Sequence, residues 1–294
     1  MPAFKCILAV ITGAEADQSV LDSALGFGRR FDAHIDVLHA RGDPRDAVPF
    51  LGEGASGALI EQIMSTAQRE AETRAQRAKQ TFESWCSKHA ISLVDRPPGP
   101  TQMSARFREE TGREDELVSK LGRLVDLIVI ARPAAENAAA SPVTFEAALL
   151  DTGRAVLATP PTMSAEAIDR IASGATMIAW NGSAQAARAV SAARRILETA
   201  GEVRVVSSAE GDMSAAATAG LVEFLAWHGI QARSATLSGK TPSVGAVLLA
   251  DAEANNVGLL VMGAYTHSRL RHMVFGGATS HVLAHAKLPV FMAH

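Results

Sequence analysis

The sequence has few cysteines and aromatic residues, and it has no long hydrophobic segment. Only two of the 294 residues are cysteine, Cys6 and Cys86, which excludes a disulfide-stabilised scaffold and a zinc site built from closely spaced cysteines. So few cysteines are typical of a reducing compartment. Cys6 lies in an apolar segment and is expected to be buried. No stretch of about 18 apolar residues occurs, so no transmembrane helix is expected.

Charge of neither sign dominates the chain. It contains 28 lysine and arginine residues against 31 aspartate and glutamate residues, for a formal net charge of −3. No basic stripe alternates with aromatic residues, so a nucleic-acid partner is not expected. The first residues carry one lysine and no small-residue cleavage pattern, which predicts a strand rather than a signal peptide. We therefore expect a cytoplasmic protein with no membrane partner.

The order of apolar segments occurs twice along the chain. Residues 4–13 form a short apolar segment, which is followed by a helical pattern over 20–31 and a second apolar segment at 34–40. The second half repeats this order between residues 175 and 208. Each half therefore begins with a predicted strand–helix–strand unit.

Both halves continue with alternating helices and strands. In the first half, the predicted elements are a long amphipathic helix over 57–89, a strand at 91–95, a helix over 108–122, a strand at 126–131, a helix over 144–151 and a strand at 155–160. In the second half, they are a helix over 215–228, a strand at 230–237, a helix from 243, a strand at 258–263, a helix from 279 and a strand at 289–293. Such alternation predicts parallel sheets built from right-handed crossovers.

The fold class expected is therefore α/β, with two tandem five-stranded Rossmann-like domains of strand order 3-2-1-4-5. The first domain is expected over residues 1–160 and the second over residues 170–294. A proline pair at 160–161 lies in the segment that joins them and supports a boundary there.

The ligand cleft of such a sheet is expected between its first and fourth strands. Ligands bind outside the carboxyl ends of the strands, where the strand order reverses. In the second half, the ends of the first, second and fourth strands converge on this cleft. The residues concerned are Trp180, Asn181, Gly182 and Ser183 after the first strand, Val206 and Ser207 after the second, and Gly263 onward after the fourth.

A glycine-bearing loop follows the fourth strand of the second half and leads into a helix. Gly276 and Gly277 stand at the predicted helix start, with Thr279 just after them. Unpaired N–H groups and the helix dipole favour an anion at such a position. The sequence therefore predicts a phosphate site here, and nucleotide binding is the first hypothesis.

These residues resemble the nucleotide motif of the universal stress protein family, and the two-part organisation resembles its tandem members. The motif is glycine, two residues, glycine, nine residues, glycine, and then glycine, serine or threonine. It runs here from Gly263 through Thr266 to Gly276 and Gly277. The resemblance extends over nearly the whole chain. It implies a fold of the adenine nucleotide alpha hydrolase type and ATP, ADP or AMP as the ligand, with or without Mg²⁺.

Three residues depart from the family's pattern. Thr266 stands at the second glycine position, where a β-branched side chain crowds a close phosphate approach. Gly277 replaces a common serine, and Asn181 replaces the aspartate that follows the first strand. The Thr279 hydroxyl can still contact a phosphate, and Asn181 can still hydrogen-bond the base or ribose.

The resemblance implies a role for each residue of the expected site. The site comprises Ala179, Trp180, Asn181, Val206, Met262, Gly263, Thr266, His267, Arg269, Gly276, Gly277, Ala278 and Thr279. Backbone amides of the glycines and of Ala278 hold the phosphates, while Ala179, Val206 and Met262 line the base pocket. For Trp180, stacking on adenine and packing at the rim both stay open. For Arg269, a phosphate contact and a solvated side chain both stay open.

The first half lacks this motif. Arg132 and Pro133 follow its fourth strand without a glycine loop, and Thr12 and Gly13 stand where the family's aspartate would be. Pro133 also removes an amide donor. We therefore expect the first half to have lost nucleotide binding and to serve as a structural partner.

No catalytic residue and no metal site are expected. No side chain near the predicted phosphates is a committed general base and no P-loop lysine motif is present, so any ATP hydrolysis should be slow. His281 and His285 share a helix face at a spacing that zinc accepts. Because no cysteine or carboxylate lies near them in sequence, a surface or packed pair is favoured.

Sensing or regulation in a stress response is the function that these observations favour. If Thr266 and Gly277 mark a second degenerate site, the chain is instead a non-nucleotide scaffold or interaction protein. An adenylate-using enzyme is disfavoured because no nucleophile or acid–base pair is apparent. The closing strands, 155–160 and 289–294, are expected to pair within one chain as a pseudo-dimer, and whole chains can pair further as a homodimer.

Overall fold

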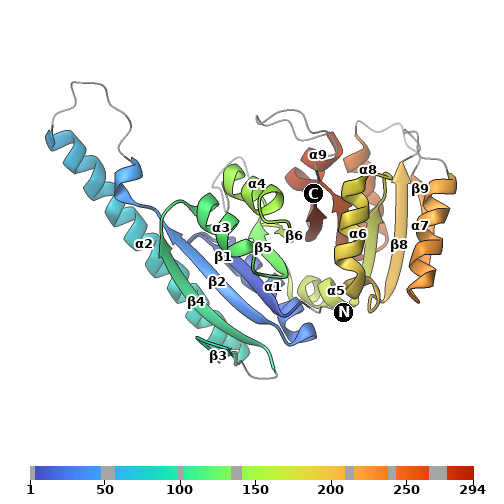
Figure 1. Cartoon of the computed structure of the whole chain (residues 1–294), viewed down its shortest axis with the longest axis horizontal. Helices are drawn as coiled ribbons and strands as arrows, with labels where there is room; N and C mark the ends of the chain where they lie inside the picture. The colour runs from blue at the N-terminus through green and yellow to red at the C-terminus, as the bar shows by residue number, and fades with distance from the viewer. Residues whose placement is uncertain are drawn as a thin grey trace.

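Figure 1 shows the computed structural model of the chain, which describes residues 4–47, 57–97, 102–133, 141–208, 215–237, 243–264 and 277–294. The two halves lie side by side, the first coloured from blue to green and the second from yellow to red. One mixed sheet runs through both of them.

The first half alternates strands and helices, as the apolar pattern predicts, with one additional strand. Its strands are β1 (Cys6–Ile11), β2 (His34–Arg41), β3 (Ser92–Leu93), β4 (Ser104–Thr111), β5 (Leu127–Ala131) and β6 (Ala155–Thr159). Its helices are α1 (Asp17–Phe31), η1 (Pro44–Ala47), α2 (Gly57–His89), α3 (Glu114–Gly122) and α4 (Pro142–Leu150). Every residue of β5 and β6 is buried, as expected for apolar strands that are covered on both faces.

The second half follows α5 (Ala165–Ser173) and repeats this alternation. Its strands are β7 (Ala175–Ala179), β8 (Glu202–Ser208), β9 (Ala232–Leu237), β10 (Val257–Gly263) and β11 (Val290–Ala293). Its helices are α6 (Ala184–Leu197), α7 (Ala215–Trp227), α8 (Val244–Ala254) and α9 (Gly277–His285). Serine hydroxyls cap the first amides of α4, α5, α6 and α8, which fixes where these helices begin.

The described strands form one eleven-stranded sheet in the order β3-β4-β2-β1-β5-β6-β11-β10-β7-β8-β9. Apart from the extra edge strand β3, each half has the predicted order. Both β4-β2-β1-β5-β6 and β9-β8-β7-β10-β11 correspond to 3-2-1-4-5, with parallel pairing between neighbours. The α/β fold predicted from the sequence is confirmed.

Strands β6 and β11 join the two halves by antiparallel pairing, which confirms the predicted pairing of the closing strands. Leu157 lies opposite Phe291 at this junction. Phe291 is fully buried, and its ring centroid lies 6.3 Å from that of Phe4 in the first half. The two halves therefore share core contacts as well as a sheet. Because the pairing is antiparallel, the carboxyl ends of their strands lie at opposite edges of the sheet.

The predicted helix over 108–122 is wrong at its start. Residues 104–111 form strand β4, and α3 begins only at Glu114. The strand predicted at 91–95 is reduced to the two residues of β3. Charged side chains in β4 hide its alternating pattern in the sequence. One of them, Arg106, is accommodated in the sheet because it forms an ion pair with Asp36 on the neighbouring strand. Such a cross-strand pair stabilises a strand that looks helical by composition.

Helix α5 lies in the segment that was expected to join two domains. Its Ile171 is buried, with 1% of its surface exposed. A β-carbon at Gly26 of α1 would lie 3.4 Å from the Ile168 carbonyl oxygen, and one at Gly258 of β10 would lie 2.4 Å from the Arg170 carbonyl oxygen. The connection is therefore a packed helix that contacts both halves.

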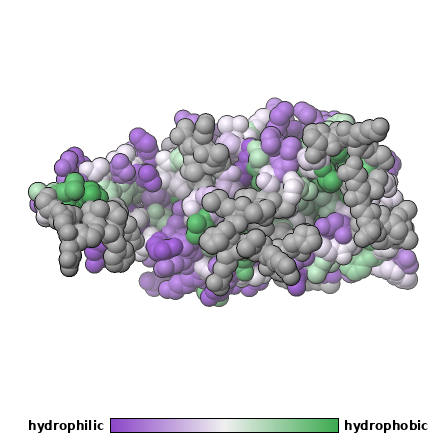
Figure 2. Space-filling view, turned by 90° about the horizontal axis from the view of Figure 1, so that it is seen from above, coloured by the Kyte–Doolittle hydropathy of each residue, from purple (hydrophilic) through white to green (hydrophobic). Residues whose placement is uncertain are grey.

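Helix α2 extends beyond the edge of the sheet (Figure 1). Its buried residues lie towards its carboxyl-terminal end, whereas Leu59 near its start is 46% exposed. Figure 2 shows hydrophobic surface at the end of the molecule where α2 begins. No described helix has both the length and the hydrophobicity that a membrane crossing requires. The expectation for Cys6 is wrong, because this residue is exposed at the amino end of β1, while Cys86 in α2 is buried.

Candidate functional site

The predicted cleft of the second half begins where β7, β8 and β10 end. Ala179 pairs with Val206 on one side and with Met262 on the other, so the three residues lie in one row across the sheet. Val206 is fully buried and Met262 is 6% exposed, while Ala179 is half-buried. The sheet thus brings together the three residues that the sequence assigns to the base pocket.

The turn after β7 is built around Asn181. Its Oδ1 accepts hydrogen bonds from the Ser183 amide at 3.2 Å and the Ser183 hydroxyl at 2.7 Å. The same hydroxyl caps α6 by accepting from the Ala186 amide at 3.1 Å. Gly182 has a φ of 69°, a left-handed conformation that glycine adopts at little cost. Asn181 therefore shapes the turn with its carbonyl oxygen, and its amide NH₂ can donate to a ligand.

Trp180 lies at the rim of this region. Its backbone N–H donates to the Val206 carbonyl at 2.8 Å, and its side chain packs against the hydrophobic core while remaining half-buried. The indole Nε1 is buried and has no hydrogen-bond partner among the described residues. The structure thus shows core packing for this side chain, together with an unused donor at the edge of the cleft.

Gly263 has a packing role that the sequence motif does not reveal. A β-carbon at this position would lie 2.4 Å from the Ala186 amide nitrogen and 2.7 Å from the Gln185 carbonyl carbon. Only glycine lets the start of α6 lie this close to the end of β10. The glycine is therefore required by the fold whether or not a ligand is bound.

The start of α9 has the opposite property. A β-carbon at Gly277 would meet no atom of another described residue within 4 Å. Thr279 is buried at 9% exposure in the first turn, and the Ala278 carbonyl approaches Gly245 of α8. Because α9 connects β10 to β11, its first amides lie at the carboxyl end of β10. Among the described residues, none thus fills the space at the start of α9, where the first backbone amides have no partner inside the helix.

Four residues of the predicted site lie outside the described residues. They are Thr266, His267, Arg269 and Gly276. Their assignment rests on the sequence motif alone.

His281 and His285 form a stacked pair on α9. Their ring centroids lie 4.2 Å apart, and the His285 Nδ1 lies 2.9 Å from the His281 carbonyl oxygen. Among the described residues, no group of three or more histidine, cysteine, aspartate and glutamate side chains could hold a metal ion. The pair is accounted for by packing within one helix.

Two acidic residues that the sequence analysis missed lie on the side of the first half where the carboxyl ends of its strands are. Asp17 is 2% exposed, and its carboxylate accepts from the Thr12 amide at 2.9 Å and the Gly13 amide at 2.7 Å. Burial raises the pKa of Asp17, against the effect of these hydrogen bonds. Burial also raises the pKa of Glu114 to about 7, helped by the charges of Asp17 and Asp115. The available signal was an acidic run at the start of a helix.

Helix α2 also closes over this end of the first half. Gly13 has a φ of 82°, and a β-carbon there would lie 2.5 Å from the Arg74 carbonyl oxygen of α2. Arg132 and Pro133 follow β5, as the sequence indicates. The position that corresponds to the second half's cleft thus contains carboxylates and a helix backbone.

The architecture described so far defines a class: two doubly wound α/β units that share one sheet through their closing strands. The family model of the universal stress protein family matches residues 175–294. The matched residues begin with β7 and extend to the last residue of the second half. A comparison with curated protein sequences gives no match.

Solved structures of similar fold extend the likeness to the whole chain. A universal stress protein from Archaeoglobus fulgidus has a TM-score of 0.64 at 18% identity, covering 98% of this chain and 97% of that one. A putative universal stress protein from Pseudomonas aeruginosa has a TM-score of 0.56 at 14% identity, covering 99% of this chain and 93% of that one. At these identities the likeness establishes the fold of both halves.

Proposed function

We propose that the second half binds an adenine nucleotide, ATP, ADP or AMP, and that the protein is a cytoplasmic regulator in a stress response. Residues 1–160 and 170–294 are two domains in this proposal, and only the second keeps a nucleotide site. The observation that carries the proposal is that no described residue lies within 4 Å of a β-carbon placed at Gly277, the first residue of α9. The match of residues 175–294 to the family model of the universal stress protein family supports it.

The phosphates are held at the start of α9. The amides of Gly277, Ala278 and Thr279 are first-turn donors with no partner inside the helix, and the helix dipole favours an anion beside them. Within this proposal Gly276, Thr266, His267 and Arg269 complete the phosphate site, and Mg²⁺ accompanies the nucleotide if its phosphates require it.

The base and sugar lie over the ends of β7, β8 and β10. Ala179 and Met262 offer an apolar floor above the buried Val206. The Asn181 amide donates to the base or ribose, and the buried Trp180 Nε1 is a second donor at the rim. An amide in place of a carboxylate brings no negative charge near the phosphates.

Isothermal titration with ATP, ADP and AMP tests this proposal. Gly277→Val should fold normally, because its side chain enters open space, but should weaken nucleotide binding at least tenfold by crowding the phosphates. Gly220→Val is the matched control, since Gly220 on α7 is equally open and lies away from the cleft. Absence of nucleotide binding by the unmodified chain, or equal loss in both variants, would contradict the proposal.

A scaffold function is the second candidate, and the surface of α7 favours it. Trp227 is 81% exposed and Phe224 is 46% exposed, and both lie on this outer helix beside the edge strand β9. Exposed aromatic residues of this kind are enriched at protein interfaces. If no nucleotide binds to either half, Phe224→Ser and Trp227→Ser are the variants with which to test partner binding.

A further inference from the structure

The first half contains a cavity that does not correspond to the proposed nucleotide site. Its volume is about 920 Å³, and it lies at the carboxyl ends of β1, β5 and β6, bounded by the start of α1 and by α2. Neither the end of β2 nor the start of α4 lines it, although their counterparts β8 and α9 contribute to the proposed nucleotide site. The two acidic residues Asp17 and Glu114 do not line it either.

The strand registers of the two halves can be compared at this cavity. Two polar residues of the first half occupy positions at which the second half has alanine. Ala131 pairs with Thr159 in the first half as Gly263 pairs with Ala293 in the second. The next backbone hydrogen bond is also the same, because the Arg132 amide donates to Thr159 at 3.0 Å and the Ala264 amide donates to Ala293 at 3.0 Å. Arg132 and Thr159 thus occupy the positions of Ala264 and Ala293, and both line the cavity.

The Thr159 hydroxyl is an unsatisfied buried group. The residue is 0% exposed, and its Oγ1 has no hydrogen-bond partner among the described residues. Valine has nearly the same shape and would avoid the cost of burying a hydroxyl without a partner. A hydroxyl at this position on the cavity wall therefore points to a ligand that completes its hydrogen bonding.

Two arginines face the same cavity without a carboxylate partner among the described residues. Arg77 of α2 makes no hydrogen bond or ion pair with another described residue, and Arg132 donates from Nη1 to the Ala286 carbonyl. Burial lowers the pKa of Arg132. Glu15 is the one acidic residue in the described lining. The described lining thus carries more positive than negative charge.

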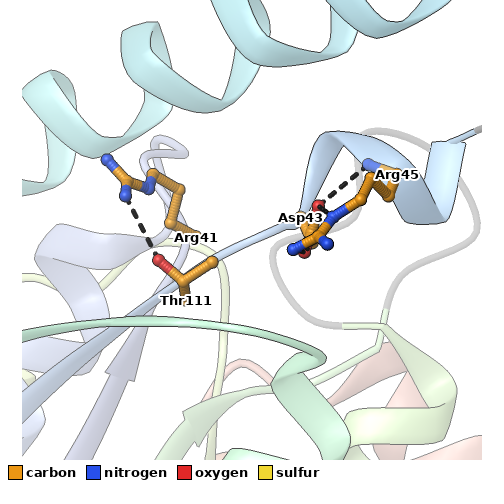
Figure 3. A network of polar contacts seen from close by, with 4 residues as sticks. All are labelled: Arg41, Asp43, Arg45 and Thr111. Carbon is orange, nitrogen blue, oxygen red and sulfur yellow. Dashed lines mark hydrogen bonds and ion pairs between the residues drawn. The ribbon is translucent and has the colours of Figure 1, made fainter.

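Other arginines at this edge of the sheet have polar partners. Figure 3 shows Arg41 bonded to Thr111 and Arg45 bonded to Asp43, with N···O distances of 3.2 Å and 2.8 Å. Arg41 also forms an ion pair with Glu109 at 3.2 Å. Arg77 differs from these two arginines, because no described residue forms a hydrogen bond or ion pair with its side chain.

The remaining polar lining is neutral and can both donate and accept hydrogen bonds. It comprises Gln18, Gln80, Thr81, Ser84 and Thr162. Guanidinium groups recognise phosphate by paired N–H donors, whereas neutral amides and hydroxyls suit alcohol groups. We propose that this cavity binds a small phosphorylated sugar or polyol, with its phosphate between Arg77 and Arg132 and one of its polar groups bonded to the Thr159 hydroxyl.

Binding of glucose 6-phosphate, ribose 5-phosphate and glycerol 3-phosphate to the full chain tests this proposal, with glucose and inorganic phosphate as partial ligands. At least one of the three phosphorylated probes should bind at least tenfold more tightly than inorganic phosphate or glucose. Equal binding of inorganic phosphate would show a general anion effect and overturn the proposal. So would the absence of binding by all three phosphorylated probes.

Three variants locate the site. Arg77→Gln, on an exposed helix face, should weaken binding about tenfold or more. Lys79→Gln removes a charge from the same helix away from the cavity and should leave binding unchanged. Thr159→Val should also weaken binding, yet raise the thermal midpoint of the ligand-free protein, because it removes the unpartnered hydroxyl. Equal weakening by Lys79→Gln, or an unchanged affinity in both cavity variants, would overturn the proposal.

This test is independent of nucleotide binding in the second half. Gly277→Val should leave sugar phosphate binding unchanged, and AMP should not compete with it. Loss of sugar phosphate binding in Gly277→Val would assign the ligand to the second half and overturn the proposal.

Discussion

The two halves of the chain differ most where their fourth strands end. In the second half, Gly263 lets the start of α6 lie against β10, whereas the matching residue of the first half is Ala131. The start of α1 and Ala131 instead line an open cavity of about 920 Å³. The first half thus has the methyl group of Ala131 and an open cavity at the position where the second half has a close contact between helix and strand.

The halves also place charge differently. Asp17 and Glu114 lie at the carboxyl end of the first half, where burial raises both pKa values. The second half has the neutral Asn181 after its first strand, and no described residue fills the space beside Gly277 at the start of α9. A polyphosphate is favoured by backbone donors and opposed by buried carboxylates. These differences are why nucleotide binding is proposed for the second half and not for the first.

The largest expected effect comes from a substitution in the core that the two halves share. Phe291→Ala removes a fully buried ring from β11 at the junction with β6, where it also approaches Phe4. We expect the free energy of unfolding to fall by about 4 kcal/mol, because a large cavity forms in the shared core. Urea unfolding followed by circular dichroism measures this loss.

Leu225→Ala is the control for this prediction, since Leu225 is fully buried in α7 of the second half. Because the halves are expected to unfold together, it should lower the free energy of unfolding of the whole chain by about 3 kcal/mol while leaving the contacts between β6 and β11 in place. If Phe291→Ala lowers the stability by less than about 1 kcal/mol, the junction is not part of the core that holds the halves together.

A reciprocal exchange at the fourth strands should give the next largest effect. Gly263→Ala places a β-carbon 2.4 Å from the Ala186 amide nitrogen and should cost about 3 kcal/mol, because backbone atoms cannot yield as a side chain would. Ala131→Gly should cost only about 1 kcal/mol, from backbone entropy in a strand. Urea unfolding of both variants measures the difference, and equal losses would contradict the packing role assigned to Gly263.

The fold was more predictable from the sequence than the site. Apolar segments such as β5 and β10 are buried on both faces, so their hydrophobicity alone locates them. Strand β4 was missed because its charged residues are paired across strands, as Arg106 is with Asp36. That pairing depends on tertiary structure and leaves no local signal.

The candidate site could be predicted only in part. The row formed by Ala179, Val206 and Met262 follows from the strand order, which the apolar pattern supplies. The packing role of Gly263 could not be foreseen, because it depends on how closely α6 approaches β10. Cys6 was misjudged since an apolar segment does not show which of its residues lies at the exposed end of a strand.

A pH-dependent effect on stability should arise from Glu114 in the first half. The Glu114 carboxyl has an ordinary pKa of 4.5, and burial raises it to about 7 in the folded chain. Below pH 4.5 the group is protonated in both states and has no effect on stability. As the pH rises towards 7, the unfolded state ionises first, so the folded state loses up to about 3 kcal/mol.

Glu114→Gln should remove this loss. Its free energy of unfolding should exceed that of the unmodified chain by about 3 kcal/mol at pH 8 and by almost nothing at pH 4.5. Glu116→Gln is the matched control, because its carboxylate lies in the same helix turn and is exposed. Urea unfolding at the two pH values measures both, and an equal gain at pH 4.5 would show that charge burial is not the cause.

The smallest expected effect concerns the unfolding midpoints of the two halves, which we expect to coincide. Cys86 of α2 reports on the first half alone, since burial and the Glu83 charge raise its pKa to about 11. At pH 8 its thiol should react with a disulfide reagent about a hundredfold more slowly than an ordinary cysteine.

The Cys6→Ser variant leaves Cys86 as the only thiol, because the sequence has two cysteines. Because the halves share a sheet through β6 and β11, Cys86 labelling in urea should have the same midpoint as the circular dichroism of the whole chain. A labelling midpoint at lower urea would show that the first half unfolds separately.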